Sequence, residues 1–167
     1  TAQISGANQT TGLALAEVYD ANFSDNAKRL TALSVRNQVG TGSGVLIVGF
    51  VIDGDAPKKV IIRGVGPGLL KDNPNLAGQV LANPTLQLHK LNTTTQTWSV
   101  VGANDDWGGT AELTAAMQAA GMGTLAADSK DAVLLLELPP GLGIYTAQLS
   151  GVGETTGIGL VEIYEAP

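Results

Sequence analysis

The chain has 167 residues, of which 44% are hydrophobic and only 14% are charged, and its net charge is −6. This length favours a single domain with one buried core. The nine Lys and Arg residues do not cluster, so we expect no nucleic-acid partner, because neutralising phosphates needs a basic patch. The absence of cysteine excludes disulfides and thiolate metal sites. The 22 glycines favour short strands joined by tight turns.

The first third of the chain reads as strands separated by turn-forming residues. Thr1–Asp20 contains two alternating runs around a Gly/Thr turn, which predicts a hairpin. The polar stretch 21–29 is an expected connector, and β structure is predicted to resume at Leu30–Arg36. Val45–Ile52 is apolar on both faces, which predicts a fully covered central strand. A turn signal follows it, so this strand is predicted to form a hairpin with Lys58–Val65.

The rest of the chain begins with an irregular stretch, 64–84, rich in Gly and Pro. Thr110–Ala120 places its apolar residues on one stripe and is followed by Gly121, so it is the one predicted helix. Ala132–Leu138 is strongly apolar and is predicted to be a central, buried strand. Further runs predict strands at Thr85–Leu91, Trp98–Val101, Ile144–Ser150 and Gly157–Tyr164.

Roughly ten strands with turns about every 8–12 residues predict an all-β fold. We expect an antiparallel β-sandwich of jelly-roll or Greek-key type over 30–167, with one short helix near residues 110–120. The longest apolar run, Val45–Ile52, is too short to span a bilayer, so no membrane insertion is expected. If the protein is exported, we expect its signal to have been removed.

The chain contains one segment twice. TAQISGANQTTGLALAEVYD at Thr1–Asp20 matches TAQLSGVGETTGIGLVEIYE at Thr146–Glu165, with eleven of the twenty positions identical and no gap. The second copy follows directly from a predicted strand, so we expect it to complete its own domain. The first copy then carries a second set of apolar residues that must also be buried.

Two arrangements of the first copy stay open. It could pair within its own sandwich, or it could add strands to a neighbouring chain, with the connector as a crossing arm. The second arrangement is heterologous and does not close, so it propagates into a homopolymer joined head to tail. The residues expected to carry the assembly contact are Ile4, Leu13, Leu15, Val18 and Tyr19.

No known catalytic pattern is present in the sequence. His89 is the only histidine, and it lies on the opposite strand face from Leu86 and Leu88. Gly42-Ser43-Gly44 lacks the spacing of a nucleophile elbow. We therefore expect that the protein is not an enzyme and needs no organic cofactor.

One loop offers oxygen ligands for a hard cation. Asn104, Asp105 and Asp106 stand in a row between glycines, and Ca²⁺ takes six to eight oxygens from loops of this kind. The alternative is that these side chains only cap turns and the helix start. The sequence leaves both interpretations open.

Several runs carry a family resemblance that covers nearly the whole chain. They are Leu30-Thr-Ala-Leu-Ser-Val-Arg, Val45-Leu-Ile-Val-Gly-Phe-Val-Ile, Val60-Ile-Ile-Arg-Gly-Val-Gly-Pro, Asn104-Asp-Asp-Trp-Gly and Tyr145-Thr-Ala-Gln-Leu-Ser-Gly. The chain resembles a β-sandwich domain found, often in tandem, in large secreted bacterial surface proteins. From Pro84 onward it is also similar to pre-peptidase C-terminal domains, some of which bind calcium or polysaccharide. The resemblance implies an extracellular, noncatalytic module.

Two functions follow as expectations. The first is a structural subunit of an extracellular bacterial filament or surface assembly, joined through the N-terminal strands. The second is a noncatalytic cell-surface module that binds glycan, with or without Ca²⁺.

Overall fold

The computed structural model describes residues 1–20 and 29–167. These residues divide into two compact units, Thr1–Leu30 and Thr31–Pro167. The connector predicted at 21–29 lies outside the described residues except for its last position.

The second unit is built from eight strands in two four-stranded sheets, so the predicted all-β sandwich is confirmed. The strands are β1 (Ala32–Val39), β2 (Leu46–Ile52), β3 (Lys58–Val65), β4 (Pro84–Asn92), β5 (Thr97–Asn104), β6 (Ala132–Leu138), β7 (Gly143–Gly151) and β8 (Gly157–Glu165). Short 3-10 turns, η2 (Gly42–Gly44), η3 (Pro67–Lys71), η4 (Pro74–Leu76) and η5 (Val152–Glu154), join several of them.

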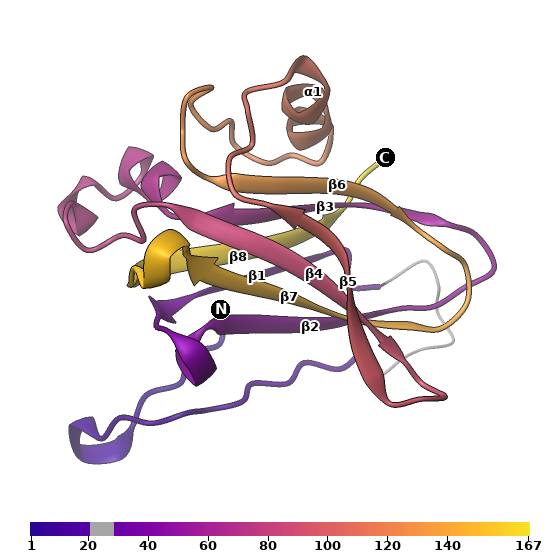
Figure 1. Ribbon diagram of the computed structural model, residues 1–167, viewed down its shortest axis with the longest axis horizontal. Helices are drawn as coiled ribbons and strands as arrows, with labels where there is room; N and C mark the ends of the chain where they lie inside the picture. Colours follow the sequence, from indigo (N-terminus) through magenta and orange to yellow (C-terminus); the bar gives the residue numbers. More distant parts are fainter. Residues whose placement is uncertain (21–28) are drawn as a thin grey trace. The chain divides into compact units, whose positions relative to one another are not determined.

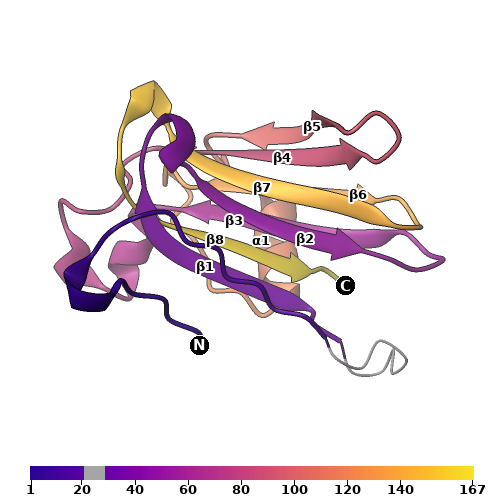
Figure 2. The ribbon, with the colours of Figure 1, turned by 90° about the horizontal axis from the view of Figure 1, so that it is seen from below.

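The strand order is that of a jelly roll. Sheet A runs β1-β8-β3-β6 and sheet B runs β2-β7-β4-β5, with every neighbouring pair antiparallel. The first strand pairs with the last, the second with the seventh, the third with the sixth and the fourth with the fifth, which makes two Greek keys. Figures 1 and 2 show the two layers of strands.

The main core fills the space between the sheets. Alternate residues of each strand point inward, as the period of two requires. In β7, for example, Tyr145, Ala147 and Leu149 are buried and the residues between them are half-buried. Phe50 of β2 stacks on Tyr145 with ring centroids 5.4 Å apart. The inward residues therefore form one continuous apolar layer that joins the two sheets.

The outer face of sheet A carries a second apolar cluster. Helix α1 (Ala111–Ala119) lies over this face, and its Met117 is buried against Ile61 and Val133. The side chain of Thr110 caps the helix by accepting a hydrogen bond from the Leu113 amide at 3.3 Å. The predicted helix is thus confirmed. None of the helices in the described part of the chain is long and apolar enough to cross a bilayer.

Several sequence predictions about strand placement are wrong. The described residues form eight strands, not ten. β2 and β3 lie in different sheets, so the hairpin predicted for them does not form. The apolar run of β2 is at a sheet edge, where Ile47 and Val51 are 53% and 59% exposed. β6 is also an edge strand, and it is buried because α1 covers it. An apolar run reports which residues avoid water, but not which strands become its neighbours.

Candidate assembly site

The second copy of the repeated segment is an arch between the two sheets. Its first strand, β7, pairs with β2 and β4 in sheet B, and its second strand, β8, pairs with β1 and β3 in sheet A. The turn η5 carries the chain from one sheet to the other. The prediction of a hairpin is therefore wrong for this copy, because β7 and β8 do not pair with each other.

The first copy has the same turn but no strands. Among residues 1–20, the only regular element is the 3-10 turn η1 (Ala7–Gln9), which matches η5 position by position. Asn8 has φ of 52°, and its counterpart Gly153 has φ of 65°. Gln9 and Glu154 are also matched, with φ of 61° and 59°.

The hydrogen bonds of the two turns agree as well. The Thr10 hydroxyl donates to the Ala7 carbonyl oxygen at 2.8 Å, and the Thr155 hydroxyl donates to the Val152 carbonyl oxygen at 2.9 Å. The Thr10 amide also donates to the Ala7 carbonyl oxygen, at 3.1 Å. Local sequence alone is therefore enough to specify the arch, since the first copy forms it without any strand partner among the described residues.

A close approach of the backbone holds each arch shut. A Cβ atom at Gly6 would lie 1.9 Å from the Thr10 carbonyl oxygen, and one at Gly151 would lie 2.2 Å from the Thr155 carbonyl oxygen. No side chain fits at such distances, so both copies need glycine at this position. The identity of these two glycines is thus a structural requirement of the arch.

The apolar side chains of the first copy are exposed. Leu13 and Leu15 are 87% and 79% exposed, and Ile4, Val18 and Tyr19 are exposed as well. The Tyr19 hydroxyl donates to the Glu17 carboxylate at 2.9 Å, and this bond together with the charge of Glu17 raises the pKa of Tyr19. Large exposed apolar residues in series mark a surface that binds a partner.

The second copy shows how these side chains would be distributed in a paired arch. In β7 and β8, six matched residues are buried on the core side, two of which are glycines, and three large apolar residues lie half-buried on the outer face of sheet A. By this match, the inner-face side chains of the donor are Ala2, Ile4, Ala14, Ala16 and Val18, and the outer-face ones are Leu13, Leu15 and Tyr19. The prediction from the sequence named only large residues, whereas the alternation of the second copy adds Ala2, Ala14 and Ala16.

The Asn104 loop uses its polar atoms within the protein. The Asn104 side chain accepts a hydrogen bond from the Val133 amide at 2.9 Å and donates to the Asp106 carbonyl oxygen at 3.0 Å. The Asp106 carboxylate pairs with the Lys130 ammonium at 2.6 Å, which raises the pKa of Lys130. No group of three acidic or histidine side chains in the described part of the chain could hold a metal ion. Calcium binding by Asn104, Asp105 and Asp106 stays a prediction.

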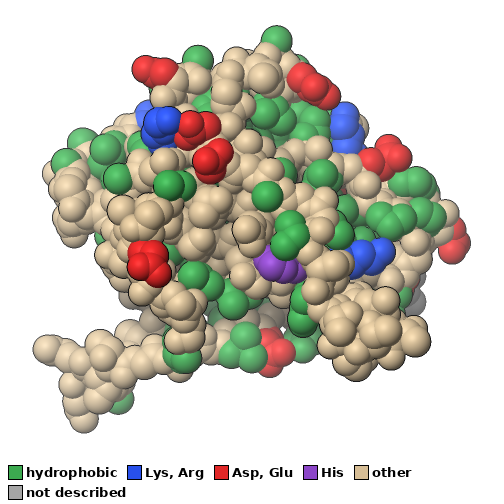
Figure 3. All heavy atoms as spheres, viewed as in Figure 1, with side chains coloured by type: hydrophobic (Ala, Val, Ile, Leu, Met, Phe, Trp, Pro, Cys, Tyr) green, Lys and Arg blue, Asp and Glu red, His purple; other side chains and the backbone are tan. Residues whose placement is uncertain are grey.

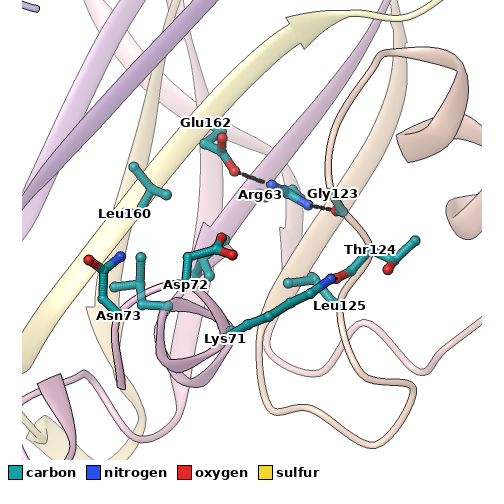
Figure 4. Close-up of a pocket in the computed structure, with 12 residues that line it drawn as sticks. Arg63, Lys71, Asp72, Asn73, Gly123, Thr124, Leu125, Leu160 and Glu162 are labelled. Carbon is teal, nitrogen blue, oxygen red and sulfur yellow. Dashed lines mark hydrogen bonds and ion pairs between the residues drawn. The ribbon is translucent and has the colours of Figure 1, made fainter. Parts of the chain in front are cut away.

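A shallow pocket lies where β3, β8 and the loop after α1 meet. Arg63 forms an ion pair with Glu162 and donates to the Gly123 carbonyl oxygen, as Figure 4 shows. Lys71 reaches across the opening to the Thr124 carbonyl oxygen at 3.4 Å. The pocket encloses about 130 Å³. Arg63 and Glu162 are almost completely buried and pair with each other, so this ion pair joins β3 to β8 at the pocket wall.

Comparisons with protein-family models, curated proteins and solved structures found no match. The most informative feature of the chain is an arch whose turn occurs twice, while only the second copy is paired with strands among the described residues. In the view of Figure 3, charged side chains are scattered and do not gather into one patch.

Proposed function

We propose that the protein is a structural subunit of an extracellular bacterial filament or surface assembly, joined head to tail through the N-terminal copy of the arch. One observation carries the proposal. Thr1–Asp20 holds the backbone shape of a sandwich arch while its large apolar side chains remain exposed. A segment with the turn of a sandwich arch, and without a strand among the described residues, suits β-strand addition to another chain.

The energetics favour burial of this segment. Fully burying one large apolar side chain contributes about 1.5–3 kcal/mol, and the exposed Ile4 and Val18 match buried residues of the second copy. Adding strands to a sheet edge also supplies backbone hydrogen bonds. If the donor is on one face of each chain and the acceptor on another, the contact is heterologous and repeats without closing. A homopolymer is the expected product.

The extracellular location follows from the resemblance to tandem domains of secreted bacterial surface proteins. The chain lacks cysteine, so no disulfide or thiol ties it to one redox environment. Its net charge of −6 and scattered cations disfavour nucleic acid as a partner. We propose a noncatalytic role because the sequence holds no known catalytic pattern.

The proposal is tested by adding charge to the donor segment. The double variant Leu13→Asp/Leu15→Asp should leave the sandwich folded and should prevent assembly, because the matched residues Ile158 and Leu160 are half-buried, and a charge at such positions would lose part of its hydration on docking. The matched control is Thr93→Asp/Thr94→Asp, which adds the same charge to the exposed turn between β4 and β5. Electron microscopy and sedimentation velocity would measure filaments and particle size. Filaments formed by the Leu13/Leu15 variant, or a wild-type chain that stays monomeric, would contradict the proposal.

A second candidate is a glycan-binding module of the cell surface. Trp98 of β5 supports it, because this indole is 47% exposed and aromatic faces stack on sugar rings. A monomeric protein retained on a polysaccharide matrix, with retention lost in Trp98→Ala, would favour this candidate over the filament.

A further inference from the structure

We propose that the acceptor for the N-terminal arch is the edge formed by β1 and β2 of a second copy of the chain. This inference rests on the proposed function and specifies its partner surface. An arch places one strand in each sheet, so it can extend both sheets only where an edge of sheet A lies beside an edge of sheet B. The strand order offers two such ends, β1 with β2 and β6 with β5.

The β5–β6 end is protected against strand addition. The Val133 amide on the outer side of β6 donates to the Asn104 side chain, and the Asp131 carbonyl oxygen accepts from the Trp107 amide at 2.9 Å. The pairing of β4 with β5 also shifts register between Leu88 and His89, which is a β-bulge. Bulges and covered edges are the usual ways in which proteins prevent edge pairing. This end is therefore a poor acceptor.

At the β1–β2 end, no strand in the described part of the chain pairs with the outer edge of β1 or of β2. The Glu165 amide donates to the Thr31 carbonyl oxygen at 2.9 Å, so the backbone groups of Thr31 point toward β8. Because these groups alternate in direction along an antiparallel strand, those of Ala32, Ser34 and Arg36 point away from β8, toward the open edge. The Gly141 amide donates to the Gly54 carbonyl oxygen at 2.7 Å, in register with the β2–β7 pairing. The same alternation places the backbone groups of Ile47, Gly49 and Val51 on the outer edge of β2.

This end also leaves the core partly uncovered. Two inward side chains of β1 and two of β2 pack against the main core but remain half-buried, and they are Leu33, Val35, Phe50 and Ile52. β2 has neither a charged residue nor a proline along its length, although both protect exposed edges. The inner-face residues of a docked arch, Ile4 and Val18 with the small Ala2 and Ala16, would cover the half-buried set.

Replacement of β7 and β8 by the donor arch is a worse fit. Gly159 of β8 lies in the core, where an added Cβ would be 2.8 Å from Cγ2 of Val39. The matched donor residue is Ala14, which brings that Cβ. Val161, which is fully buried, is matched by the smaller Ala16. The donor sequence thus suits addition at an edge better than exchange with the strands already present.

The first test uses proline on the two edges. Ser34→Pro removes a backbone amide that points away from β8, so the sandwich should tolerate the substitution. An incoming strand would lose that hydrogen-bond donor and would collide with the proline ring. The matched control is Glu137→Pro, on the outer edge of β6. The Ala166 amide donates to the Lys59 carbonyl oxygen, so the backbone groups of Lys59 point toward β8. Glu137 pairs with Lys59, so its own backbone groups point away from β3, toward the outer edge. We expect Ser34→Pro to raise the critical concentration for assembly at least roughly tenfold, and Glu137→Pro to leave it unchanged.

The second test does not depend on a proline being tolerated. A photoreactive residue at Leu13 of the full chain would be cross-linked in assemblies grown from mixed ¹⁴N- and ¹⁵N-labelled chains. We expect cross-links between chains to fall within β1, at 32–39, because Leu13 lies in the donor strand that would extend sheet A. Cross-links within one chain, cross-links to β5 or β6, or normal assembly of folded Ser34→Pro would overturn the β1–β2 acceptor. If assembly is still lost in Leu13→Asp/Leu15→Asp, the proposed function survives such a result and only the acceptor is wrong.

Discussion

Asn8 and Gly153 hold matched positions in the two copies of the repeated segment and share a left-handed backbone conformation, with ψ of 36° and 32°. Glycine adopts this conformation without a steric penalty, and asparagine is among the few other residues that tolerate it. The two residues differ in type but satisfy the same backbone requirement. The arch is therefore encoded in the turn itself, and pairing of the flanking strands is not needed to form it.

The first prediction concerns Gly6. In Gly6→Ala the added methyl group would lie 1.9 Å from the Thr10 carbonyl oxygen, so the donor arch must open. We expect the critical concentration for assembly to rise roughly tenfold, which corresponds to about 1.4 kcal/mol. Sedimentation velocity across a concentration series would measure it. The melting temperature should not change, because the sandwich does not use Gly6.

Two comparison variants make this result specific. Gly151→Ala introduces the same clash within the sandwich, with 2.2 Å to the Thr155 carbonyl oxygen, and should lower the melting temperature. Gly123→Ala adds a methyl group into open space and should change neither quantity. Unimpaired assembly of Gly6→Ala would show that the arch shape is not required in the donor.

Local patterns in the sequence were enough to predict the sandwich and its helix. The alternation at Gly157–Tyr164 became β8, and the apolar stripe with Gly121 became α1 with a glycine at φ of 73° after its end. These features depend on neighbouring residues only. The same is true of the repeated segment, whose two turns follow from two matched sequences.

Strand partners could not be predicted in the same way. A short turn between two alternating runs fits a hairpin within one sheet and an arch between two sheets equally well. Thr146–Glu165 forms the arch because β2 and β4 flank its first strand and β1 and β3 flank its second. Those partners lie far away in sequence. The edge position of β2 was missed for the same reason, since its apolar residues gave no sign of a missing neighbour.

The second prediction concerns Asp131, a fully buried carboxylate. It accepts hydrogen bonds from the Gly66 amide at 2.7 Å and the Gly68 amide at 3.0 Å, and from the Ser129 hydroxyl. In Asp131→Asn the side-chain NH₂ group would replace one carboxylate oxygen, so a hydrogen-bond donor would face another donor and one of these bonds would be lost. We expect the free energy of unfolding to fall by about 2–3 kcal/mol, the usual contribution of a hydrogen bond to a charged group.

Urea denaturation at neutral pH would measure this change. The control is Asp128→Asn, a neighbouring exposed carboxylate, which should change the free energy by less than about 0.5 kcal/mol. Equal effects of the two variants would mean that the buried carboxylate does not hold the loop that contains Gly66 and Gly68.

The third prediction concerns calcium at the Asn104 loop. If Asp105 and Asp106 bind Ca²⁺, the ion must compete with the Lys130 ammonium for Asp106. Calcium at a hundred times its dissociation constant would then stabilise the fold by about 2.7 kcal/mol. A chelator should lower the melting temperature, and Asp105→Asn/Asp106→Asn should remove that response. Magnesium in place of calcium is the control. A melting curve that does not respond to the chelator would leave these residues with the turn and ion-pair roles alone.

The fourth prediction separates edge addition from strand exchange. Gly159→Ala gives β8 the residue that the donor arch carries at the matched position, and its methyl group would lie 2.7 Å from Cδ2 of Leu149 in the core. Overpacking of this kind costs about 1–3 kcal/mol. Gly49→Ala on β2 is the control, because its nearest neighbours would lie at ordinary contact distances of 3.8 Å and 4.0 Å. A sandwich that accepts the Gly159→Ala substitution at no cost in urea denaturation would remove the steric argument against exchange. In that case the donor arch could replace β7 and β8 of a neighbour, and cross-links from Leu13 should reach Val80, which pairs with the matched residue Ile158.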